Sequence, residues 1–174
     1  MRALGLALRA NDGRGDATLL SERVPAHLGT PDAEAALTGL YTGAIPYARL
    51  FELARVLLDA AADGDAPARQ AADTLADEIA TFVRAAVVRL DLQNEAVEVV
   101  LGGGIFETTD VAFHARVAAG VHAAAPRATL VHLDAPPVLG AALIGLDAED
   151  APASSLSALR QELQHPSVGP TGAP

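Results

Sequence analysis

The residues with the clearest chemical content are three consecutive glycines, Gly102, Gly103 and Gly104, which follow a mostly apolar run at 97–101. Residues without side chains let a ligand lie directly against the backbone, where free N–H groups can bind anions or ribose hydroxyls. Glycines at the end of a strand are equally typical of a tight turn, so the spacing leaves both interpretations open. Glu107 occupies the third glycine position of the dinucleotide fingerprint, which disfavours a Rossmann dehydrogenase, and no Gly-Lys-Ser/Thr follows to make a P-loop.

The other polar residues form no second site in the sequence pattern. His114 and His122 lie eight residues apart on one predicted helix, too far apart to hold one metal ion at ligand distances of ~2 Å. His132 falls in a predicted strand and fits a histidine of the core. Asp134 follows that strand, where a turn-capping carboxylate is favoured over a nucleotide contact. We therefore predict no catalytic residue and no metal site.

A second polar group lies near the N-terminus, in the glycine-containing loop that follows the first predicted helix. Asp12 and Arg14 are two residues apart in this loop. They could form a local ion pair or approach an adenine ring. The short spacing favours the ion pair.

Composition excludes several classes of protein. The 174 residues are 51% apolar, which suffices for one globular domain with a core. A formal net charge of −10 disfavours nucleic acid and anionic membranes as partners, because both attract clustered Lys and Arg. The absence of cysteine excludes disulfides, thiolate ligands and thiol nucleophiles. No apolar stretch reaches ~18 residues and no cleavage site of a secretory signal is apparent, so we expect a cytoplasmic protein.

The elements that must position the glycines begin with a helical first half. Helices are predicted from capping residues, proline and glycine at about 4–11, 18–28, 30–43, 46–64 and 65–90. The last of these has the strongest pattern, with apolar residues at intervals of three and four that predict one buried face. These residues are Leu75, Ile79, Phe82, Val83, Ala86, Val87 and Leu90.

The second half changes character, and the fold class predicted is α/β and mostly helical. Buried strands are predicted at 97–101 and 128–133, joined by a helix that Thr108 or Thr109 caps, which describes a parallel βαβ unit. Helices are also predicted at 138–146 and, in short form, at 156–163. We divide the chain into a domain at 1–147 and a tail at 148–174, acidic and then rich in Pro, Gly and Ser, with its last ten residues disordered.

Several segments in order form a pattern larger than any one motif. They are 7–18 (Ala-Leu-Arg-Ala-Asn-Asp-Gly-Arg-Gly-Asp-Ala-Thr), the helix boundary Gly64-Asp65, 99–106 (Val-Val-Leu-Gly-Gly-Gly-Ile-Phe) and 136–143 (Pro-Pro-Val-Leu-Gly-Ala-Ala-Leu). Over about 1–147 this pattern resembles the BadF/BadG/BcrA/BcrD-type ATPases of the actin/hexokinase superfamily, which include N-acetylglucosamine kinases. The resemblance implies part of a ribonuclease-H-like, actin-like ATPase lobe, with Gly102, Gly103 and Gly104 as contacts to the adenosine of ATP.

Parts of that family's machinery are missing from this sequence. The Asp-Gly-Gly-Gly-Thr-like first phosphate motif, the Gly-Ser/Thr-Gly second loop and the Asp expected as base are all absent, although phosphoryl transfer depends on such groups. The resemblance therefore implies the C-terminal, nucleotide-side part of an ATP-dependent sugar kinase or related ATPase, with Mg²⁺ held mainly by the missing lobe. By itself the chain is expected to be inactive.

Two consequences stay open at this stage. A catalytically inactive nucleotide-binding or assembly module, or a truncated product, is the alternative function. The zero cysteines disfavour an activator with an iron–sulfur cluster. We also expect an unpaired sheet edge, which a second copy or a chain carrying the missing N-terminal half would cover.

Overall fold

Three helices of the structure begin directly after an aspartate whose carboxylate caps them, namely Asp32, Asp65 and Asp110. The structure is a computed structural model and describes residues 2–133 and 135–164. It is α/β and mostly helical. The elements are α1 (Arg2–Asn11), α2 (Leu20–Leu28), α3 (Ala33–Thr42), α4 (Arg49–Ala62), α5 (Ala66–Arg89), β1 (Glu98–Leu101), the 3-10 helix η1 (Gly104–Glu107), α6 (Val111–Ala124), β2 (Thr129–His132), α7 (Pro137–Ala148) and α8 (Ala153–Gln164).

The chain divides into two compact units, Met1–Val131 and His132–Pro174. The predicted boundary at 147 instead falls at the end of α7. In the second unit, α7 packs against α8, so the segment after 147 contains a helix of its own at 153–164. The predicted disorder of the last ten residues lies outside the described residues. No described helix combines the length and apolarity needed to cross a membrane.

Two helix caps differ from prediction. The sequence Thr30-Pro31-Asp32 predicts a cap by the Thr30 hydroxyl, but Asp32 caps α3, since its Oδ1 accepts from Ala35 N at 2.7 Å. Asp110 caps α6 in place of Thr108 or Thr109, accepting from Ala112 N and Phe113 N. In both cases the aspartate directly precedes the first helical residue, whereas the threonine lies one or two positions earlier, and Asp caps a helix at least as well as Thr.

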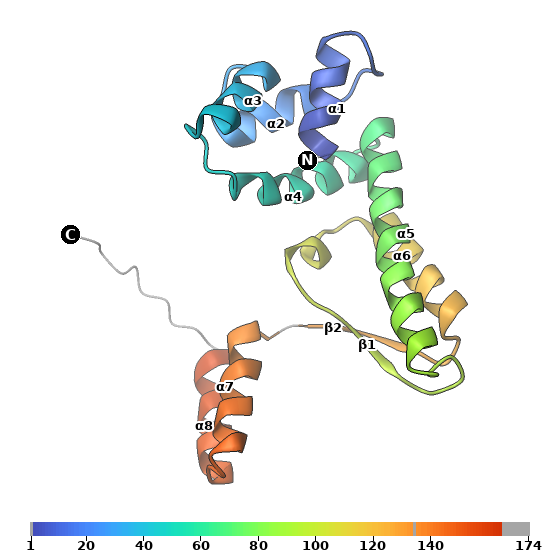
Figure 1. Ribbon diagram of the computed structural model, residues 1–174, viewed down its shortest axis with the longest axis vertical. Coiled ribbons are helices and arrows are strands. Elements are labelled where there is room, and N and C mark those ends of the chain that lie inside the picture. The colour runs from blue at the N-terminus through green and yellow to red at the C-terminus, as the bar shows by residue number, and fades with distance from the viewer. Residues whose placement is uncertain (1, 134, 165–174) are drawn as a thin grey trace, which may run out of the picture. The chain divides into compact units, whose positions relative to one another are not determined.

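The long helix α5 buries small side chains instead of its largest ones. Its buried residues are Ala68, Ala71, Ala72, Ala76 and Val87. Phe82 and Leu90, predicted on the buried face, are 73% and 66% exposed. Figure 1 shows α5 and α6 running side by side. Alanine permits neighbouring helices to approach closely, whereas a phenylalanine facing them would hold them apart.

The two helices approach each other closely at Gly120 of α6. A Cβ added there would lie 2.4 Å from Ala80 Cβ of α5. We expect Gly120→Ala to lower the free energy of unfolding by about 2 kcal/mol, because overpacking outweighs the gain in helix propensity. Urea unfolding followed by circular dichroism measures this loss.

The matched control for Gly120 exchanges the two residues. The double variant Ala80→Gly with Gly120→Ala moves the methyl group from α5 to α6, so the contact again holds one methyl group. The gain in helix propensity at position 120 offsets the loss at position 80. Its stability should return to within about 0.5 kcal/mol of the starting protein. A single variant Gly120→Ala as stable as the parent would show that α5 and α6 are not packed this closely.

The strands form a two-stranded parallel sheet, β1 beside β2. The prediction that both strands are buried is wrong, since Leu101 is the only buried residue in either strand. Val97 and Val99 are partly buried against the core. Val100, which lies between Val99 and Leu101 in the sequence, is 56% exposed. The physical reason is that alternate side chains of a strand point to opposite faces, and only one face of this sheet packs on the core.

Candidate functional site

The glycine segment forms the turn between β1 and η1. Gly102, Gly103 and Gly104 are all exposed. Gly103 has φ 104° and ψ 158°, a backbone conformation that residues with a side chain rarely adopt. Gly104 lacks this requirement, and a Cβ added there would meet no atom within 4 Å. The turn therefore needs glycine at 103, while at 104 the missing side chain leaves space open.

A groove of about 500 Å³ opens beside this turn, between α4 and the start of η1. Its lining residues are His27, Phe51, Glu52, Ala54, Arg55, Val56, Asp59, Gly104 and Ile105. Of the three glycines predicted as a site, Gly104 thus lines the groove, and Gly102 and Gly103 lie just before it in the exposed turn. The volume is in the range of small-molecule sites, which are commonly 300–1,000 Å³.

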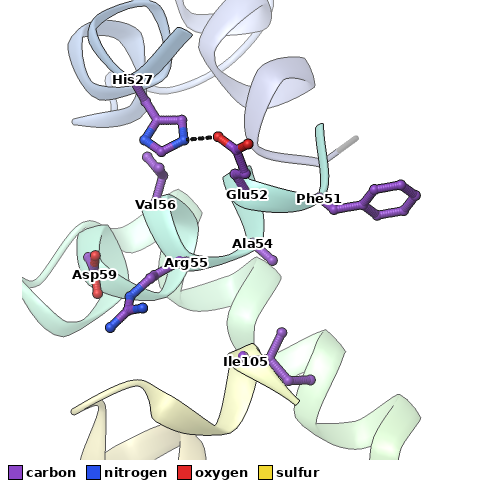
Figure 2. Close-up of a pocket in the computed structure, with 9 residues that line it drawn as sticks. His27, Phe51, Glu52, Ala54, Arg55, Val56, Asp59 and Ile105 are labelled. Carbon is purple, nitrogen blue, oxygen red and sulfur yellow. Dashed lines mark hydrogen bonds and ion pairs between the residues drawn. The ribbon is translucent and has the colours of Figure 1, made fainter. Parts of the chain in front are cut away.

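One end of the groove carries a hydrogen-bonded pair from two helices. His27 Nε2 of α2 lies 2.8 Å from Glu52 Oε2 of α4, and Figure 2 shows this bond. Since a carboxylate only accepts, His27 Nε2 carries the proton. Arg49 adds a second bond to Glu52 at 3.0 Å, and its Nη2 also donates to the carbonyl of His27. The bond from His27, followed by that from Arg49, lowers the pKa of Glu52 below its ordinary value.

The remaining charged groups of the groove are Arg55 and Asp59, one turn apart on α4. Arg55 Nη1 lies 3.3 Å from Oε2 of Glu107, the last residue of η1, and both side chains are more than half exposed. The Asp59 carboxylate has no hydrogen bond or ion pair within residues 2–133 and 135–164. In Figure 2 both side chains are drawn away from the His27 and Glu52 pair. Asp59 is therefore available to accept hydrogen bonds from a ligand.

The segment after the turn is fixed to the helices behind it. The buried Asp110 pairs with Arg69 of α5 while it caps α6. His114 Nε2 donates to the carbonyl of Thr108 at 2.8 Å, and the Phe106 ring lies 6.3 Å from that of Phe113. These contacts hold the connection between η1 and α6, so the groove wall at Gly104 and Ile105 has a supported position.

The other residues considered from sequence lie elsewhere. Asp12 and Arg14 form the predicted ion pair, with Asp12 Oδ2 2.5 Å from Arg14 Nη2, and the hydrogen bond from Arg14 lowers the pKa of Asp12. His122 contacts the carbonyl of Ala128 at 3.2 Å. His132 is exposed, so its prediction as a core histidine is wrong. Asp134 lies outside the described residues, among which no three His, Cys, Asp or Glu side chains gather in a way that could hold a metal ion.

Sequence reasoning missed the α4 side of the groove. The sequence predicts residues 51–59 only as part of the helix at 46–64, and no motif marks Arg55 or Asp59. A usable signal would have been their spacing of four residues, which places an acid and a base together on one helical face. No protein-family model matches the chain, and no curated protein and no solved structure matches it either.

Proposed function

We propose that this chain is the adenosine-binding, nucleotide-side part of an ATP-dependent sugar kinase of the N-acetylglucosamine kinase type, or of a related ATPase. The observation that carries the proposal is the groove beside the exposed glycine turn, with Gly104 in its wall and space where a side chain would be. This combination suits a nucleoside, because a glycine lets the ribose or the base approach the backbone closely while the groove encloses the rest of the ligand.

The chemistry of the groove walls suits the parts of adenosine. Ala54, Val56 and Ile105 supply apolar surface for the base. The Asp59 carboxylate, which has no partner among the described residues, is a suitable acceptor for ribose hydroxyls, a role that acidic residues have in other nucleotide sites. Sites of this kind are mostly apolar with a small number of polar groups that fix the orientation of the ligand.

Phosphate transfer would need groups from elsewhere. The sequence contains no Asp-Gly-Gly-Gly-Thr-like motif, and Mg²⁺ and the phosphates are normally held by such motifs and by carboxylates near them. We expect the 174-residue chain to bind nucleotide without transferring phosphate. A second copy, or a chain that carries the phosphate motifs, would cover an outer edge of the two-stranded sheet.

The test is a thermal-shift titration of the chain with adenosine and with ATP, each with and without Mg²⁺. Ligand at ten times its Kd should add roughly 1.4 kcal/mol of stability, or roughly 4 °C in the melting temperature. Because the phosphate motifs are absent, adenosine and ATP should stabilise the chain about equally, and Mg²⁺ should change neither value.

A nucleoside without the ribose hydroxyls serves as the control ligand. If Asp59 accepts from these hydroxyls, 2′,3′-dideoxyadenosine should give a clearly smaller shift than adenosine at equal concentration. No shift with any of the ligands, from a sample that unfolds cooperatively, would reject the assignment of Gly102, Gly103 and Gly104 as nucleotide contacts.

A further inference from the structure

Arg55, a cation that lines the groove, pairs with a carboxylate on η1 that lies outside the lining residues. Arg55 and His27 are the only basic side chains among the described residues that line the groove. His27 is engaged with Glu52 at one end. Arg55 extends from α4 to Glu107, which lies three residues after Gly104 on η1. An arginine side chain thus already spans the distance between α4 and the segment that follows the glycine turn.

We propose that Arg55 binds the phosphates of a nucleoside diphosphate in this groove and that Glu107 competes with them for its guanidinium. This inference rests on the proposed nucleotide-binding function. A guanidinium group binds a phosphate as readily as it binds a carboxylate, and in both cases two of its N–H groups can donate to the anion. A phosphate lying along the exposed backbone near Gly104 would be close to Glu107, so the two anions repel and the carboxylate weakens the binding of the phosphate to Arg55.

Because the ion pair of Arg55 and Glu107 is exposed, replacing the carboxylate by a phosphate costs little free energy. The side chains of Arg55 and Glu107 are 59% and 66% exposed, and ion pairs this exposed contribute little to stability. The chain as a whole is strongly acidic, with a formal net charge of −10, so an incoming phosphate needs a local cation. Glu107 therefore sets how much the phosphates add to the binding of the nucleoside.

The experiment compares adenosine and ADP by isothermal titration calorimetry on the full chain, without Mg²⁺. In Glu107→Gln the Kd for ADP should fall about fivefold while the Kd for adenosine stays unchanged, because only the phosphates gain Arg55. In the parent chain, where Glu107 occupies Arg55, ADP and adenosine should bind about equally, and the double variant Arg55→Gln with Glu107→Gln should return to this equality because it lacks Arg55. The fivefold gain should shrink at 1 M salt, where the Debye length is about 3 Å.

The matched control is Asp77→Asn, which removes one carboxylate from another exposed ion pair, with Arg116, and changes the net charge equally. In Asp77→Asn the ratio of the Kd for adenosine to the Kd for ADP should equal that of the parent chain. An unchanged ratio in Glu107→Gln, or the same gain in the double variant, would overturn this inference while leaving adenosine binding intact. Loss of adenosine binding in the parent chain would overturn the proposed function, and this inference with it.

Discussion

Replacing Gly104 by valine is expected to raise the Kd for adenosine about a hundredfold, equal to about 2.7 kcal/mol, without destabilising the fold. A Cβ at this position meets no protein atom within 4 Å, and Gly104 has no positive φ that would strain a side chain. The branched side chain would therefore extend into the space that the proposed ligand needs. Titration calorimetry measures the affinity, and urea unfolding verifies the stability.

The matched control for Gly104→Val is Gly5→Val in α1, outside the groove. Gly5 also has open space around its Cβ and no positive φ, so the change in chemistry is the same. Its affinity for adenosine should equal that of the parent chain. If Gly104→Val binds adenosine as tightly as the parent, the glycine turn is a turn only, and the groove binds no nucleoside along it.

Replacing Asp65 by alanine is expected to lower the free energy of unfolding by about 3 kcal/mol. Asp65 is only 7% exposed, and it joins the starts of two helices that are distant in the chain. Its Oδ1 accepts from Thr18 Oγ1 at 2.9 Å and from Ala68 N at 2.7 Å, and its Oδ2 accepts from Leu19 N at 2.6 Å. Alanine would remove the N-cap of α5 and leave the donors before α2 without an acceptor.

Two further variants separate the role of Asp65 from a general effect of charge. Asp63→Ala removes a neighbouring carboxylate whose ion pair with Arg23 is exposed, and it should cost less than 1 kcal/mol. Asp65→Asn keeps one accepting oxygen and should lie between the parent and alanine. Equal midpoints of urea unfolding for Asp63→Ala and Asp65→Ala would contradict the buried network.

The sequence predicted the elements well where short-range signals act. Prolines, glycines and capping carboxylates act within four residues along the chain, so α3 ends at Gly43 and α5 begins after Asp65 as predicted. The change of hydrophobic period after 97 likewise predicted β1, α6 and β2 as a parallel unit. The predicted ribonuclease-H-like lobe stays a prediction.

Burial was less predictable, because it depends on which elements are neighbours. Phe82 and Leu90 share the helical period of α5 with residues of the core, yet both are exposed. α6 packs closely against α5 at Ala80, where Gly120 leaves room, and this contact lies 40 positions apart in the sequence. Periodicity gives the width of an apolar face, but not the part of it that a neighbour covers.

By itself, the sequence predicted a glycine turn after the first strand as one of two interpretations, because the preference of glycine for turns is a property of a few adjacent residues, and the structure gives Gly103 a positive φ. Only the tertiary structure decided that this turn faces α4 and that Arg55 and Asp59 share a groove with Gly104. Gly104 lies 45 positions after Asp59 and 49 after Arg55, and no local sequence pattern indicates that they are close in space. Packing of α4 against η1 and α6 brings them together, so the site arises only in the folded chain.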